Sequence, residues 1–255
     1  MFLDSHAHLT CDPVFKDLDG ILMRAQKEGV DTIINVCTDK TTLKRGFDLA
    51  ETYKWVYHIG ATTPHDVEKE GDLNFYLFEK AAHEGKLVAI GETGLDYYYE
   101  HSSKILQQEF LYRYFALSLA CNLPVVMHCR NAFADLFAFA EKYFSTGKGV
   151  LHCFTGTLEE AKKGIDKGWL ISFSGIITFK KSIELRRIVK EIPLDHILIE
   201  TDTPYLAPQS KRGKSNEPSF IREIAQTIAN VKGIFLEEVA EVTRKNAREL
   251  FQLAR

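Results

Sequence analysis

Hydrophobic and polar residues change their period repeatedly along this chain. Short runs rich in β-branched and aromatic residues alternate with longer segments in which apolar residues recur every three or four positions. The short runs predict strands, because turn-forming residues bound them. These eight runs cover residues 2–8, 31–37, 55–61, 87–92, 124–128, 149–153, 169–175 and 196–202.

The segments between these runs predict helices. Residues 17–29 carry Leu18, Ile21 and Leu22 at helical spacing, and Gly29 follows as a stop signal. Helical spacing also covers residues 101–122, 182–192, 216–231 and 236–254. For the fourth of these, Asn216 is the expected N-cap.

Strands and helices alternate over residues 1–255, and this alternation predicts an α/β protein. The number of strands and the chain length favour a (β/α)8 TIM barrel that forms a single domain. An open, doubly wound parallel sheet is the alternative.

Composition and charge narrow the classes of protein that fit. Hydrophobic residues make up 45% and charged residues 26% of the chain, as in globular proteins. The formal net charge of −3 means that any nucleic-acid contact must come from a local basic surface. Five scattered cysteines, no secretory signal and no membrane-spanning run predict a cytoplasmic protein. No segment points to an obligate protein partner.

Two histidines in the first predicted strand introduce the candidate chemistry. His6 and His8 are two positions apart, so both side chains project from the same face of a strand. They lie near the carboxyl end of the strand, which faces the active-site mouth in a barrel. Two imidazoles in this position can bind one metal ion, although the pair alone is weak evidence.

Residues of the metal-binding type end four further predicted strands. In three of them the residue two positions earlier is apolar (Ile90, Val126 or Val150) and is expected to point the same way, into the barrel core. Such residues at the same end of five strands predict a metal site. The four residues are Glu92, His128, His152 and Asp202.

The set of four imidazoles and two carboxylates is too large for one tetrahedral ion with an open position. It suits two divalent ions bridged by Glu92, roughly 3.5–4 Å apart. We expect one ion on His6, His8, Glu92 and Asp202, and the other on Glu92, His128 and His152. The nitrogen and oxygen ligands do not choose among Zn²⁺, Mn²⁺ and Mg²⁺.

Other residues near these positions are expected to orient the ligands or to pack in the core. Strand alternation places Asp4 and Glu200 below the ligands, where they would orient them. The same alternation turns Cys129 and Cys153 away from the mouth, so we interpret both as packing residues.

A pair of divalent ions predicts metal-assisted hydrolysis. The ions lower the pKa of water and offset negative charge on a phosphoryl or acyl oxygen. Glu92 would act in catalysis as the bridge. Asp202 either binds metal only or also accepts the proton of the attacking water.

Several short motifs together resemble one family. "DSHAHL", "GETGLDYYY", "HCR", "HCFTG", "TDTPYL" and "RGKSNEP" follow the order and spacing of TatD-type metal-dependent deoxyribonucleases. The resemblance runs from residue 2 to the terminal helix. It implies a barrel of the amidohydrolase superfamily, two divalent ions, and hydrolysis of DNA from a 3′ end of single strands. The family's metal ligands fall on His6, His8, Glu92, His128, His152 and Asp202.

The resemblance also suggests substrate contacts. Arg130 matches a family position suited to holding phosphate. The family commonly has a His-Pro pair after the third strand, where this chain has Thr63 and Pro64, so His65 would serve instead. Arg212 belongs to a basic loop, "QSKRGKSNEP", that would hold phosphate beside the mouth.

Two further assignments remain open at this point. Tyr97, Tyr98 and Tyr99 would either stack on bases or pack within the protein. The overall function also has alternatives, namely a two-metal hydrolase of a small phosphoester, amide or lactone, and a barrel that binds without catalysis.

Overall fold

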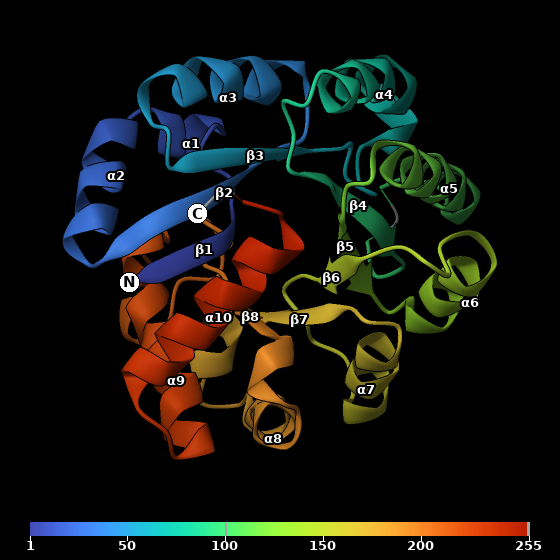
Figure 1. Ribbon diagram of the computed structural model, residues 1–255. Helices are drawn as coiled ribbons and strands as arrows, with labels where there is room; N and C mark the ends of the chain where they lie inside the picture. Colours follow the sequence, from blue (N-terminus) through green and yellow to red (C-terminus); the bar gives the residue numbers. More distant parts are fainter. Residues whose placement is uncertain (100, 254–255) are drawn as a thin grey trace.

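The computed structural model describes residues 1–99 and 101–253, and eight strands form one parallel sheet at its centre. The strands lie side by side in chain order, and Figure 1 shows them ringed by helices. They are β1 (Phe2–Ala7), β2 (Val30–Cys37), β3 (Val56–Gly60), β4 (Ala89–Asp96), β5 (Val125–Arg130), β6 (Gly149–Leu151), β7 (Leu170–Phe173) and β8 (Ile197–Ile199). The predicted (β/α)8 barrel is confirmed, and the open doubly wound alternative is wrong.

Helices follow the strands and cover the outside of the barrel (Figure 1). They are α1 (Asp12–Phe15), α2 (Leu18–Lys27), α3 (Lys40–Thr52), α4 (Val67–His83), α5 (Lys104–Cys121), α6 (Phe133–Tyr143), α7 (Leu158–Asp166), α8 (Ile183–Glu191), α9 (Ile221–Lys232) and α10 (Leu236–Leu250). Short 3-10 turns are η1 (Gly175–Thr178), η2 (Leu194–His196), η3 (Gln209–Lys211) and η4 (Pro218–Phe220). None of the helices in the described ranges combines the length and apolar character needed to cross a bilayer.

One predicted helix boundary is wrong. Asn216 does not cap a helix, because η4 intervenes and α9 begins only at Ile221. The Asn216 side-chain amide instead donates to the carbonyl oxygens of Thr201 and Tyr205, at 2.6 and 2.7 Å. A buried asparagine therefore fastens the loop after β8, and tertiary hydrogen bonds override its preference for a cap.

The core has an inner and an outer layer. Val126 and Val150 lie in the inner cluster, inside the barrel, as expected. Ile90 lies in the outer cluster instead, and the ladder between β4 and β5 is irregular between Ile90 and Thr93, so alternation does not carry over from Ile90 to Glu92. Residues at the end of α10, including Phe251, pack into the inner cluster, so the chain's last turn closes one end of the barrel (Figure 1).

The seam between β1 and β8 is closed by side chains as well as by backbone. The backbone contributes one isolated bridge, Ala7 to Thr203, and a bond from Asp202 N to His6 O at 2.9 Å. The buried Asp4 carboxylate accepts hydrogen bonds from Thr201 N at 2.9 Å and from Thr201 Oγ1 at 2.6 Å. The seam therefore fixes the positions of the residues that follow both strands.

A buried histidine in the outer layer predicts how stability depends on pH. His58 in β3 is 4% exposed, and its Nδ1 lies 3.1 Å from the amide nitrogen of Asn35. Burial lowers the pKa of His58 to about 4. Below pH 6.5 the unfolded chain gains a proton there that the folded chain does not, so the stability of the fold falls until pH reaches about 4.

We expect this histidine to account for about 3 kcal/mol of the loss in unfolding free energy between these two pH values. Urea denaturation of the metal-free protein at a series of pH values measures it. His58→Gln should show a shallower acid slope, while His196→Gln on η2 serves as the control and should keep the original one. Equal slopes in all three proteins would contradict the assignment.

Candidate metal centre

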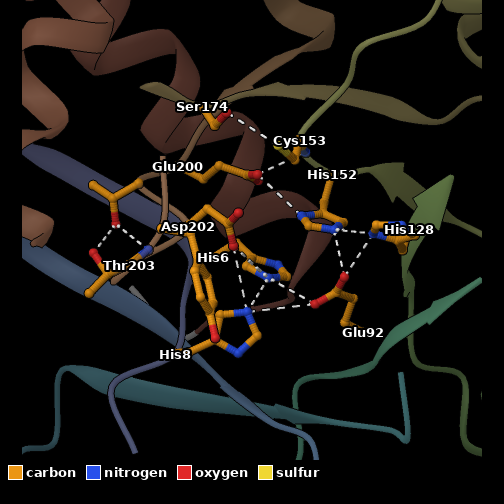
Figure 2. Close-up of polar contacts among 12 residues, drawn as sticks. His6, His8, Glu92, His128, His152, Cys153, Ser174, Glu200, Asp202 and Thr203 are labelled. Carbon is orange, nitrogen blue, oxygen red and sulfur yellow. Dashed lines mark hydrogen bonds and ion pairs between the residues drawn. The ribbon is translucent and has the colours of Figure 1, made fainter. Parts of the chain in front are cut away.

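Six side chains converge at the carboxyl ends of the strands (Figure 2). His6 lies in β1 and His8 directly follows it, while His152 directly follows β6. Glu92 lies in β4 and His128 in β5, and Asp202 lies beyond the end of β8. The structure thus brings together all six residues that the sequence predicted as metal ligands.

Glu92 lies between two pairs of histidines. Its Oε1 is 3.0 Å from His128 Nδ1 and 3.0 Å from His152 Nε2. Its Oε2 is 3.5 Å from His6 Nε2 and 3.6 Å from His8 Nε2. The irregular ladder after Ile90 lets this side chain face the inside of the barrel although Ile90 faces outward. One carboxylate therefore presents a different oxygen to each pair, which is the geometry that a bridging ligand needs.

Asp202 joins the pair from the first strand. Its Oδ1 is 3.7 Å from His6 Nε2 and 3.5 Å from His8 Nε2. The backbone at Asp202 is left-handed, with φ near 60°, so strand alternation no longer decides where its side chain points. The backbone bond to His6 across the seam holds it in place instead.

The histidines are held from behind by carboxylates. Glu200 Oε1 accepts from His152 Nδ1 at 3.2 Å and from the Cys153 backbone N–H at 2.8 Å. Asp96 Oδ2 accepts from His128 Nε2 at 2.8 Å. Carboxylates in this position fix the tautomer and orientation of metal-binding imidazoles. Glu200 occupies the supporting place that the sequence predicted.

The sequence reasoning missed Asp96, although a signal was present. Asp96 is four positions after Glu92, and the period of two along β4 puts both on the same face. Asp4, the other predicted support, accepts from the His6 backbone N–H at 3.3 Å and so acts on the backbone beside the site.

The donor set can be tested against a cation. Because the outer nitrogens of His128 and His152 donate to carboxylates, a neutral ring leaves a lone pair on each inner nitrogen. These nitrogens lie 3.4 Å apart, and both face Glu92 Oε1. Three acceptors this close repel one another unless a positive charge lies among them. The residues therefore fit a metal ion.

The pKa values respond to the same crowding. Burial opposes a charge on His152, but the negative charges of Glu92 and Glu200 outweigh it and raise the pKa of His152 well above its usual value. Burial likewise opposes ionisation of Glu92, yet the charge of His152 and hydrogen bonds from histidines hold its pKa well below its usual value. These shifts favour an ionised Glu92 carboxylate with a positive charge beside it.

Within the described residues, overlapping groups of three place their possible ligand atoms within 4.8 Å of one another. The groups are His6, His8 and Glu92; Glu92, His128 and His152; His6, His152 and Asp202; and His65, Asp96 and His128. The first two share Glu92 and match the division that the sequence suggested, apart from Asp202.

The predicted substrate residues differ in their distance from this centre. His65 Nε2 is 3.5 Å from Asp96 Oδ2, and its ring centroid is 5.4 Å from that of His128. Thr63, which stands at the family's histidine position, bonds through Oγ1 to Asp66. His65 therefore lies beside the centre, and the Thr63 hydroxyl donates to Asp66.

The two predicted arginines lie on different loops. The Arg130 guanidinium lies 3.8 Å from the centroid of the Tyr98 ring. Arg212 lies over the ring of Phe179 at 4.6 Å and lines a cavity of about 260 Å³ with Leu206 and Lys214. Within the described part of the chain, Arg212 makes no hydrogen bond or ion pair with the six candidate ligands.

The two cysteines that directly follow candidate histidine ligands, Cys129 and Cys153, have different surroundings. Cys129 packs against the outer core, as alternation predicts. Cys153 departs from that prediction, because β6 ends at Leu151 and the backbone at Cys153 is left-handed, with φ near 44°. Its Sγ lies 3.2 Å from Ser174 Oγ, beside the Glu200 carboxylate (Figure 2).

Comparison with known proteins adds the family. The model of the family described as TatD related DNase matches residues 3–252. An "uncharacterized metal-dependent hydrolase" of Bacillus subtilis is 39% identical, covering 99% of this chain and 100% of its own. The chain belongs to the TatD family. The resemblance read from the motifs is confirmed.

Two other relatives extend this comparison. A "3'-5' ssDNA/RNA exonuclease TatD" of Citrobacter koseri is 32% identical to the TatD-family chain described here, covering 98% of it and 99% of its own length. A solved TatD homologue from Escherichia coli is 27% identical, with a TM-score of 0.93 over 99% of this chain and 98% of its own. Family membership and the buried clusters make this chain a metal-dependent hydrolase.

The carboxylate behind His152 gives a prediction for this TatD-family site. Glu200→Gln keeps an oxygen that can accept from His152 but removes the charge, so divalent metal should bind about 10–100-fold more weakly. Titration calorimetry of the metal-free protein with Mn²⁺ or Zn²⁺ measures the affinity. Glu159→Gln, on the exposed surface of α7, is the matched control. An unchanged affinity in the Glu200 variant would show that this contact does not support the site.

Proposed function

We propose that this TatD-family hydrolase holds two divalent ions and cleaves phosphodiester bonds of single-stranded DNA, starting from a 3′ end. The observation that carries the proposal is the Glu92 carboxylate, which presents Oε2 to His6 and His8 and Oε1 to His128 and His152. The first ion would lie among His6, His8, Glu92 and Asp202. The second would lie among Glu92, His128 and His152. Mg²⁺, Mn²⁺ and Zn²⁺ all suit this ligand set.

The ions, when bound, lower the pKa of water and offset the negative charge on a phosphoryl group. The chain's own residues would exclude bulk water from the centre and position the group that accepts a proton. Burial of His6 and His152, which are 0% and 6% exposed, keeps bulk water from one side of the centre. Asp202, which is 8% exposed beside His6 and His8, would accept a proton from an attacking water.

Four residues would contact substrate groups at or near the mouth. Arg130 offers N–H groups to a phosphate, since its flat face rests on Tyr98 and leaves its edge for hydrogen bonds. The ring centroid of His65 is 5.4 Å from that of His128, so His65 would meet a substrate beside the second ion. Arg212 and Lys214, around their small cavity, would contact phosphates farther along the strand.

The choice of DNA is supported by the relative in Citrobacter koseri, whose name records exonuclease action on single-stranded DNA and RNA. The Bacillus subtilis relative, at higher identity, has a name that gives no substrate. Hydrolysis of a small phosphoester, amide or lactone is therefore the second candidate. Metal-reconstituted protein, given 5′- and 3′-labelled single strands beside a panel of small esters, distinguishes the two. Fragment ladders would also show the direction of cleavage.

The bridging geometry predicts a strong effect of removing Glu92. Glu92→Ala should lower hydrolysis by about 1000-fold and reduce the metal content below that of the wild type, because both histidine pairs lose the carboxylate that they share. Elemental analysis and turnover of a labelled oligonucleotide measure the two effects. Glu51→Ala, on the exposed surface of α3, is the control for the loss of a carboxylate. Full turnover by the Glu92 variant would refute the bridge.

The placement of the two arginines predicts different kinetic effects. Arg130→Ala should raise KM for oligonucleotides about 10-fold, because Arg130 is beside the centre. Arg212→Ala should raise KM less and should reduce the slope of log KM against log salt by about 1, the amount for one phosphate contact. Steady-state rates at several salt concentrations measure both. If KM is unchanged in the Arg212 variant, its loop lies outside the path of the substrate.

A further inference from the structure

Exposed aromatic rings flank the candidate metal centre on two sides. On one side Tyr98, Tyr99 and His101 form a group that we call the aromatic platform. On the other side Tyr205 lies next to His8. We propose that these rings are base-stacking subsites, and that the nucleobases on either side of the scissile phosphate stack on the platform and on Tyr205. This inference rests on the proposed function.

The aromatic platform is open to a ligand and close to the centre. Tyr98 and Tyr99 are 54% and 43% exposed, a large exposure for rings of this size. The rings of Tyr99 and His101 are stacked, with centroids 5.5 Å apart and planes at 9°. His65 connects the platform to the centre, since its ring centroid is 5.7 Å from Tyr99 and 5.4 Å from His128.

The platform is also held rigidly. Asp96 Oδ1 accepts hydrogen bonds from the backbone N–H groups of Tyr98 and Tyr99, at 2.9 and 2.8 Å. Its other oxygen accepts from His128. One carboxylate therefore fixes both a candidate metal ligand and the loop that carries the rings. A preorganised surface loses little conformational freedom when a base stacks on it.

Arg130 couples the platform to a phosphate. Its guanidinium lies 3.8 Å from the Tyr98 ring centroid and 4.8 Å from that of Tyr99. The Tyr98 and Tyr99 rings meet edge to face, with planes at 88°, so the guanidinium can stack on the nearer ring, Tyr98, and keep its N–H edge free. A base on the platform and an adjoining phosphate on the Arg130 edge together describe one nucleotide.

Tyr205 offers the second subsite. It is 57% exposed, and its ring meets that of His8 edge to face, with centroids 5.8 Å apart. Its backbone is fixed by a bond from its N–H to Asp202 O at 2.8 Å and by the buried Asn216 amide at 2.7 Å. The loop after β8 thus holds this ring as firmly as Asp96 holds the platform.

The two subsites belong to different ends of the bridge. His8, beside Tyr205, faces Glu92 Oε2, whereas His128, beside His65 and the platform, faces Glu92 Oε1 (Figure 2). A phosphodiester placed at Glu92 has one nucleoside on each side. Stacking on aromatic side chains tolerates any base, because every base has a π-face. The expected specificity is for unpaired bases, whatever their sequence.

The test combines ring variants with abasic oligonucleotides. The variants are Tyr98→Ala, Tyr205→Ala, Tyr98→Phe and Tyr205→Phe. The substrates are a natural single strand and two versions with a tetrahydrofuran residue on one side or the other of the cleaved bond. Tyr98→Ala should raise KM for the natural strand about 10-fold, yet leave KM unchanged for the strand that lacks the base on the platform side.

Tyr205→Ala should show the same pattern with the other abasic strand, and both Phe variants should behave as the wild type. If Tyr98→Ala raises KM equally for all three strands, its effect comes from freeing Arg130, and stacking is refuted. No change in any variant would also overturn the proposal.

A failure of the proposed function gives a different result. In that case the wild type cleaves none of the strands, and the kinetic comparison is replaced by binding. Fluorescence anisotropy of the same oligonucleotides with the metal-free protein then reads stacking alone. The natural strand should bind about 10-fold more tightly than either abasic strand, and each Ala variant should remove one of the two differences. Equal binding of all three strands would refute the subsites.

Discussion

The arrangement depends on acceptors that crowd around one carboxylate. Glu92 Oε1 faces two imidazole nitrogens at 3.0 Å, and those nitrogens lie 3.4 Å from each other. The outer nitrogens of these two rings donate to Asp96 and Glu200, so in each neutral ring the lone pair lies on the inner nitrogen. Such a cluster is stable only around positive charge. The site therefore requires a cation, and the surrounding carboxylates add negative charge that favours one.

The barrel supplies the rigidity that this crowding demands. Between the first and last strands, the Asp4 carboxylate bonds to Thr201 at 2.9 and 2.6 Å and adds to the few backbone bonds there. Asp202 follows that seam directly, and its backbone N–H bonds to His6 O. The closure of the fold and the position of a candidate ligand therefore rest on the same few residues, and loosening either would loosen the other.

Single side chains also connect the centre to the loops around its mouth. Asp96 uses one oxygen for His128 and the other for the backbone of Tyr98 and Tyr99. Asn216, which lies in the basic loop, donates to the carbonyl of Tyr205 beside His8. Groups that would meet a substrate are therefore positioned by the groups that surround the centre. A single strand bound as proposed would therefore meet loops whose backbone is already held by hydrogen bonds.

Period-two alternation and strand ends are local properties, so residue order alone was enough to predict the strands, their order and the convergence of six ligand-type residues. The predictions for Ile90 and Cys153 were wrong, since an irregular ladder and a left-handed residue break the alternation. Asn216 was expected at a helix start, whereas its side chain binds the carbonyls of Thr201 and Tyr205. Which oxygen of Glu92 meets which histidine, and which carboxylate lies behind each ring, follows from folding alone, because those distances join residues far apart in the chain.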